Sequence, residues 1–85
     1  MESFRIYIKP TAVKEIESLP KKDRLRIIAK IKTLAENPRP SGCEKLSGEV
    51  KYRIRRGSYR LVYSIQDGAR EVLIVKVGHR KDVYR

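Results

Sequence analysis

The chain has 85 residues, with 21 lysines and arginines against 10 aspartates and glutamates, which gives a formal charge of +11. This length fits a single domain over residues 1–85 that must bury most of its apolar residues in one core, and it excludes a second domain. The single cysteine excludes an internal disulfide, no Cys/His cluster has metal-ligand spacing, and no run approaches the roughly 18 apolar residues of a membrane span.

The first expected elements are a strand and a short helix. Phe4, Ile6 and Ile8 alternate with basic and aromatic residues, a period of two that is typical of a strand with one buried face. Thr11 then occupies a position that favours a helix N-cap, and apolar residues at helical spacing predict a helix that ends before Pro20.

A longer helix is expected from Lys21 onward. Its apolar residues recur at intervals near 3.6, while lysines and arginines occupy the other sides. Asn37, Pro38 and Pro40 end this helix, and we expect a loop over residues 37–48. Because the connection between the two helices is short, they should form an antiparallel hairpin.

The second half of the chain predicts three strands. Residues 52–55 and 59–65 alternate around a turn at residues 56–58, which predicts a hairpin. After a second turn at residues 66–68, the nearly continuous apolar run 72–77 predicts a central strand that is covered on both faces. The order indicates an α+β domain, in which a helical hairpin covers one face of a mainly antiparallel sheet that ends in a three-stranded meander.

The predicted hairpin gathers positive charge. If its apolar residues face the helices, Arg53, Arg55 and Arg60 project together from the opposite, solvated face, and Lys51 and Arg56 flank them. Like charges on adjacent strands destabilise a sheet unless an anion binds there, and the planar guanidinium suits phosphate. We favour a phosphate site over the alternative, in which these are ordinary solvated residues of an edge hairpin.

Other residues carry weaker signals. The pI near 10.2 favours a nucleic-acid binder, although a basic protein that binds an acidic partner protein has the same composition. Without further information, we interpret His79, the only histidine, as a surface or capping residue. We interpret Tyr84 as a residue that packs on the sheet. Cys43 has no base nearby in the sequence, so a nucleophilic role is not expected.

Two stretches resemble a known family. KLSGEVKYRIRRGSYRLVYSI and VLIVKVGHRKDVYR are similar to segments of the RelE/ParE superfamily of bacterial and archaeal toxins, most closely its RelE branch, and the similarity covers nearly the whole chain. The resemblance implies a toxin with the RelE-like, microbial-ribonuclease-like fold, which cleaves mRNA in the ribosomal A site without a metal or cofactor. Because no apolar run could span a membrane and the N-terminus lacks the pattern of a signal peptide, we expect a cytoplasmic protein. The resemblance also implies a cognate antitoxin that inactivates the toxin, and operator DNA contacted only through the antitoxin complex. We expect this antitoxin to be acidic where it meets the basic patch of the predicted hairpin, and we expect no membrane contact.

The resemblance also assigns roles to residues. Arg60 would steady the scissile phosphate, Arg80 would stabilise it or protonate the departing 5′ oxygen, and Tyr84 would stack on or orient the nucleotide. Arg53 and Arg55 stand where the best-known RelE toxins have lysines, one of which is a candidate base. Arginine, with a pKa of about 12.5 or higher, is a poor base at neutral pH.

Three interpretations of proton transfer therefore stay open: the arginines act only by electrostatics and positioning, Lys51, Lys81 or His79 transfers the proton, or catalysis is weak. We favour an arginine-dominated site with His79 as a helper, and we expect Lys51, Arg56, His79 and Lys81 to contact RNA. Two other functions compete with the nuclease. One is a ParE-like inhibitor of DNA gyrase without nuclease activity, and the other is a structural member that binds only antitoxin and DNA.

Overall fold

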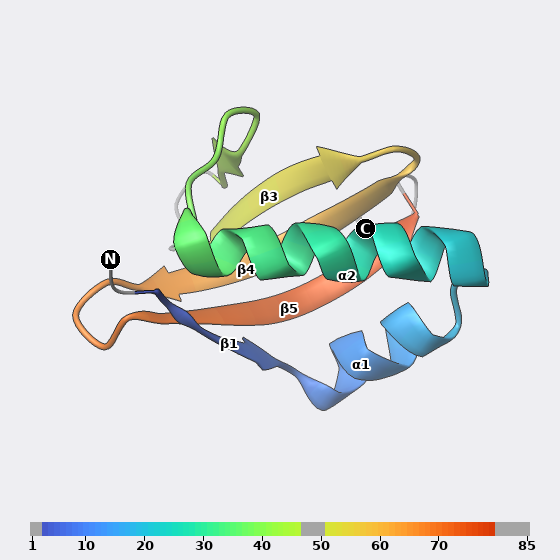
Figure 1. Ribbon diagram of the computed structural model, residues 1–85, viewed down its shortest axis with the longest axis horizontal. Helices are drawn as coiled ribbons and strands as arrows, with labels where there is room; N and C mark the ends of the chain where they lie inside the picture. Colours follow the sequence, from blue (N-terminus) through green and yellow to red (C-terminus); the bar gives the residue numbers. More distant parts are fainter. Residues whose placement is uncertain (1–2, 47–50, 80–85) are drawn as a thin grey trace.

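The computed structural model describes residues 3–46 and 51–79 of the chain, which form a sheet in the strand order β1-β5-β4-β3-β2 with two helices on one side (Figure 1). The elements are β1 (Arg5–Ile8), α1 (Pro10–Glu17), α2 (Lys21–Glu36), β2 (Glu44–Lys45), β3 (Lys51–Arg56), β4 (Tyr59–Gln66) and β5 (Glu71–His79). Helix α2 crosses the face of the sheet, whereas α1 runs from the end of β1 along β5. This arrangement confirms the predicted α+β class and the antiparallel meander of β3, β4 and β5.

Strand β1 is the one parallel partner among the described strands, and it pairs with β5. Because β1 ends at Ile8, opposite Ile74, the outer edge of β5 continues beyond it. Helix α1 contacts this part of the edge through Glu15. The Glu15 carboxylate accepts hydrogen bonds from the Val77 N–H at 2.9 Å and from Lys76 Nζ at 3.1 Å. The first helix therefore continues the edge pairing that the first strand begins.

Two sequence predictions about these elements are wrong. Helix α1 begins at Pro10 with Lys9 as its N-cap, so Thr11 lies inside the helix. Proline suits the first helical position, because its fixed φ is helical and its missing N–H is one that the helix leaves unpaired. The loop expected over residues 37–48 contains the short strand β2, which pairs with β3 at the sheet edge.

The prediction that residues 72–77 are covered on both faces is also wrong. Val72, Ile74 and Val77 are buried, but Leu73 and Val75 are only partly buried, because the helices cover one face of the sheet. The middle of the strand order belongs to β4, where four consecutive residues, Arg60–Tyr63, are buried. An apolar run thus identified a buried strand, but its position in the sheet depends on long-range pairing.

The core lies between α2 and the sheet. Ile27 and Leu34 of α2 meet Leu61, Tyr63 and Ile74, and each of these side chains is at most 1% exposed. The Tyr63 hydroxyl donates a 2.8 Å hydrogen bond to the Pro38 carbonyl, so the core also fixes the segment that follows α2. Burial raises the pKa of Tyr63 well above its ordinary value, which keeps the hydroxyl protonated as a donor.

Arg39, an exposed residue of the segment that follows α2, also binds this segment to the sheet. Its guanidinium donates to both carboxylate oxygens of Asp67, at 3.0 and 2.8 Å, and its Nε donates to the Tyr52 hydroxyl at 3.2 Å. The hydrogen bonds from Arg39 lower the pKa of Asp67 below its ordinary value. The contribution of this pair to stability is therefore present at neutral pH, and it is lost as the pH falls through the lowered pKa of Asp67.

We predict that Tyr63→Phe lowers the free energy of unfolding by about 1–3 kcal/mol, because it leaves the buried Pro38 carbonyl without its hydrogen-bond donor. Tyr52→Phe is the matched control, since its hydroxyl is only partly buried and its partner Arg39 keeps Asp67; its cost should be smaller. Urea unfolding of both variants gives the comparison. Equal losses would contradict the anchoring role of Tyr63.

Candidate functional site

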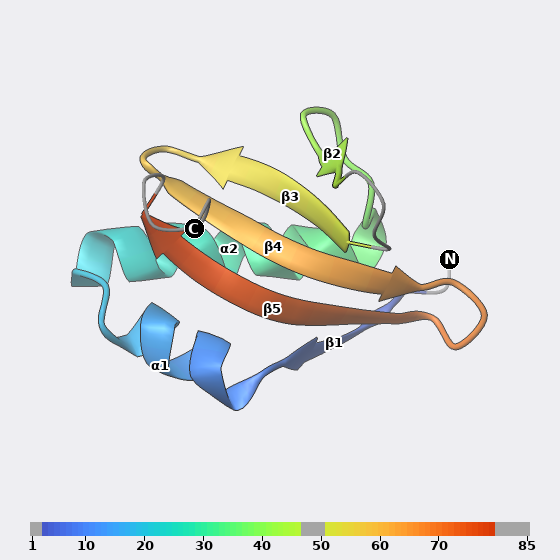
Figure 2. The same ribbon diagram turned by 180° about the vertical axis from the view of Figure 1, so that it is seen from behind.

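The face of the sheet that points away from the helices is turned toward the viewer in Figure 2, and the ladder between β3 and β4 places a row of basic residues on it. Arg55 stands directly opposite Arg60 in the β3–β4 ladder, and Arg53 stands opposite Val62. Because residues that are directly opposite point to the same face and alternate residues share it, Lys51, Arg53, Arg55 and Arg60 lie together, as predicted. We call these four residues the arginine face.

Arg60 departs from the prediction in one respect, because it is only 2% exposed rather than solvated. It belongs to the middle strand, whose side chains are flanked from both neighbouring strands, whereas Arg55 on β3 is exposed. Burying a guanidinium is costly, and placing Arg55 directly opposite it adds repulsion. A bound anion would offset this repulsion, and a cation on a strand that is paired on both sides is already positioned to meet it.

The structure adds a residue that sequence reasoning missed. Strand β2 brings Glu44 opposite Arg53, with Glu44 Oε2 at 3.4 Å from Arg53 Nη2. The arginine face thus includes a carboxylate at its outer edge, although residues 51–60 contain none. The available signal was the Ser47–Gly48 pair between the two segments, which is typical of a hairpin turn and would have predicted their pairing.

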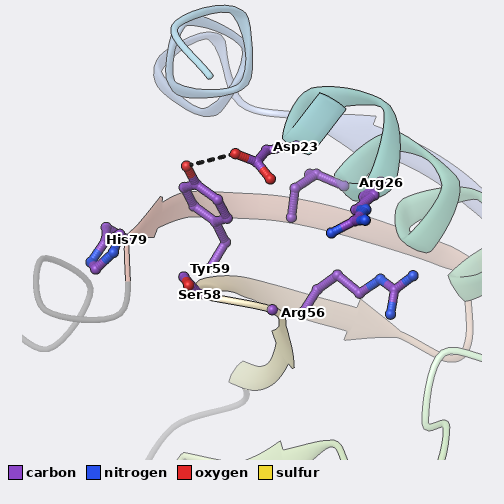
Figure 3. A pocket seen from close by; sticks show the side chains of 8 residues that line it. Asp23, Arg26, Arg56, Ser58, Tyr59 and His79 are labelled. Atoms are coloured by element: carbon purple, nitrogen blue, oxygen red, sulfur yellow. Dashed lines mark hydrogen bonds between the residues drawn. The ribbon is translucent and has the colours of Figure 1, made fainter. Parts of the chain in front are cut away.

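Arg56 and His79 point to the other face. Tyr59 is opposite Arg56 in one ladder and opposite His79 in the other, so all three residues lie on the helix side. The rings of Tyr59 and His79 meet edge-on with their centroids 5.8 Å apart, and the Tyr59 hydroxyl donates to Asp23 of α2 at 3.2 Å (Figure 3). The sheet therefore separates Arg56 and His79 from the arginine face, although they were predicted as part of one RNA-binding set.

The remaining predicted site residues, Arg80, Lys81 and Tyr84, lie outside the described residues. Within residues 3–46 and 51–79, no three His, Cys, Asp or Glu side chains gather as metal ligands would. In the same part of the chain, no helix has the length and apolar character needed to cross a membrane. Cys43 is a partly buried free thiol next to the core.

Comparison with known proteins gives the family. Residues 6–84 match the family described as the ParE toxin of type II toxin–antitoxin systems, parDE. The chain belongs to the ParE/RelE toxin family. The toxin RelE of Mycobacterium tuberculosis is 31% identical over 85 residues, which cover 96% of this chain and 87% of the relative.

Solved structures agree with this assignment to the ParE/RelE family. The toxin–antitoxin complex RelBE2 of M. tuberculosis contains a chain with a TM-score of 0.82 and 27% identity, and the match covers 92% of this chain and 99% of that one. A mutant of the Escherichia coli toxin RelE in the free state has a TM-score of 0.79 and 31% identity, with 99% and 92% covered. The protein is therefore a type II toxin of the RelE type, whose solved neighbours include complexes with the antitoxin RelB.

The arginine face should show its electrostatic cost in stability. We predict that Arg55→Gln raises the free energy of unfolding by about 0.2–1 kcal/mol, because it removes the like charge directly opposite Arg60. The gain should shrink at high salt, where repulsion between the charges is screened. Lys45→Gln, an exposed cation opposite Tyr52, is the control and should change little. A loss of stability in Arg55→Gln would show that the two arginines do not repel.

Proposed function

We propose that this protein is a ribosome-dependent endoribonuclease of the cytoplasm, which cleaves mRNA in the A site and is neutralised by a cognate acidic antitoxin. The observation that supports this most is the pairing of Arg55 with Arg60 on the middle of the sheet. Two arginines directly opposite one another in the ladder, one of them buried, suit a phosphate on which negative charge develops. Binding of an acidic protein alone requires no such pair.

The reaction would be attack of the RNA 2′ oxygen on the adjacent phosphorus. The new P–O2′ bond forms as the P–O5′ bond breaks, which gives a 2′,3′-cyclic phosphate and a 5′-OH. Arg60 and Arg55 would stabilise the charge on the phosphoryl oxygens, while Lys51 and Arg53 position the strand. By resemblance, Arg80 would stabilise the phosphate or protonate the departing oxygen, and Tyr84 would orient the nucleotide.

The proton of the 2′-OH needs an acceptor, and arginine is a poor one. His79 faces the helix side of the sheet beside Tyr59, which weighs against it as this acceptor. Glu44 is better placed, because its carboxylate already lies at the edge of the arginine face next to Arg53. We therefore add Glu44 to Lys51 and Lys81 as a candidate general base.

The first test is primer extension on a defined mRNA in translating ribosomes. The wild-type protein should create new 3′ ends at A-site codons, and Arg60→Ala should lower the cleavage rate by a hundredfold or more, about the effect of removing one charge stabiliser. Lys32→Gln on the exposed side of α2 is the matched loss of a cation and should cleave normally.

Intact mRNA with the wild-type protein would reject the nuclease. The matching family carries the name of the ParE toxin, and a ParE-like gyrase inhibitor is the alternative function. The same protein would then be assayed for inhibition of DNA supercoiling by gyrase. If neither activity is found, the structural alternative remains, in which the protein binds only its antitoxin and, through it, operator DNA.

A second variant tests the base. Glu44→Gln should lower the cleavage rate by about 10²–10⁴ and flatten the acidic limb of the pH–rate profile, because the amide cannot accept the 2′ proton. Its stability should change by less than about 1 kcal/mol, since the ion pair with Arg53 is largely exposed on the Glu44 side. Lys45→Gln is the control on the same strand. An unchanged profile would leave the proton to a lysine or to water.

The antitoxin is expected to cover the arginine face with acidic side chains. Neutralising charges that already repel one another would stabilise the toxin as well as block it. RelE toxins are found in complexes with RelB antitoxins among the solved neighbours of this chain. We extend that partnership to this protein as part of the proposal.

A further inference from the structure

A second basic site lies on the helix side of the sheet. A pocket of about 280 Å³ opens between the first half of α2 and the turn that joins β3 to β4. Its lining includes two guanidinium groups, one imidazole, two hydroxyl groups and one carboxylate, which belong to Arg26, Arg56, His79, Ser58, Tyr59 and Asp23 (Figure 3).

The charges in this pocket favour an anion. The carboxylate in this lining, that of Asp23, already accepts a hydrogen bond from the Tyr59 hydroxyl at 3.2 Å. Arg26 and Arg56 are both exposed, one from the helix and one from the end of β3. A neighbouring hollow shares these two arginines and adds Lys30, so the positive lining continues along α2.

The position of the pocket connects it to the arginine face. Strand β2 pairs only with Tyr52 and Arg53, so beyond Arg53 the outer side of β3 is an open edge of the sheet in the described part of the chain. At this edge Arg55 and Arg56 follow one another and point to opposite faces. A bound strand can therefore pass around the end of β3 and meet a guanidinium on each side.

We propose that this pocket is a second phosphate site for RNA, which holds a backbone phosphate of the strand outside the scissile position. The inference rests on the proposed function, because it assumes that the arginine face binds the same RNA. Arg26 and Arg56 contact the phosphate, and the neighbouring Tyr59 and His79 rings offer a surface on which a base stacks. The polar, basic lining suits a phosphate, and the aromatic pair beside it suits a base, so the pocket fits a nucleotide.

The test measures binding, so that it does not depend on cleavage. The probe is a single-stranded RNA with 2′-O-methyl groups, which cannot be cut, and its dissociation constant is measured by fluorescence anisotropy over a range of salt. Arg26→Gln combined with Arg56→Gln should weaken binding about tenfold and reduce the salt slope by about 1 for each lost contact. The control is Lys14→Gln combined with Lys32→Gln, two exposed cations that line neither hollow.

Two results would overturn the proposal. One is a double variant that binds the RNA as tightly as the control does. The other is a double variant that keeps its RNA affinity but binds the antitoxin more weakly than the control does. That result would assign the pocket to an acidic protein segment. In a second measurement, NMR titration with the same RNA should shift the Gly57 amide and the His79 ring signals, and unshifted signals would also contradict the proposal.

The outcome for this pocket is separable from the outcome for the nuclease. If the wild-type protein binds the probe through Arg26 and Arg56 but leaves mRNA intact on ribosomes, the proposed function fails and the site stands. If mRNA is cut and the double variant binds the probe like the control, the nuclease stands and the second phosphate site fails.

Discussion

The pairing of β4 on both of its sides is the constraint from which the rest of the structure follows. Its inward side chains, Leu61 and Tyr63, provide the surface on which α2 packs. Its outward side chain Arg60 is buried by the same position in the middle of the strand order. Strand β4 thus places core residues on one face of the sheet and a positive charge on the other. A change of its pairing register by one residue would move both sets of side chains to the opposite faces.

This coupling explains how a small domain tolerates concentrated positive charge. The repulsion expected between the arginines that stand opposite one another is offset by a core in which several large side chains are fully buried. A charge on a strand that is paired on both sides loses little entropy when an anion binds, whereas the same charge on a loop would first have to be ordered. The stability that the core provides on one face of the sheet thus allows the arginines to remain clustered on the other face, where they can bind an anion.

Much of this arrangement was predictable because strands alternate. The period of two correctly placed Arg53, Arg55 and Arg60 on one face, but the same rule applied to Arg56 and His79 would have removed them from that set. The burial of Arg60 and the central place of β4 were not predictable, since both depend on which strands become neighbours. Strand β2 has two residues, too few to show any period, so Glu44 could be found only through its pairing with β3.

The parallel pairing of β1 with β5 joins the first and last strands of the described chain. Among the described strands β1 comes first in the chain but pairs with β5, the last one, and α1 too depends on β5 through Glu15. Loop-closure entropy must be overcome before such distant contacts stabilise anything. Strand β1 and helix α1 therefore cannot complete their native contacts until β5 has formed, so the first and last described elements become ordered together.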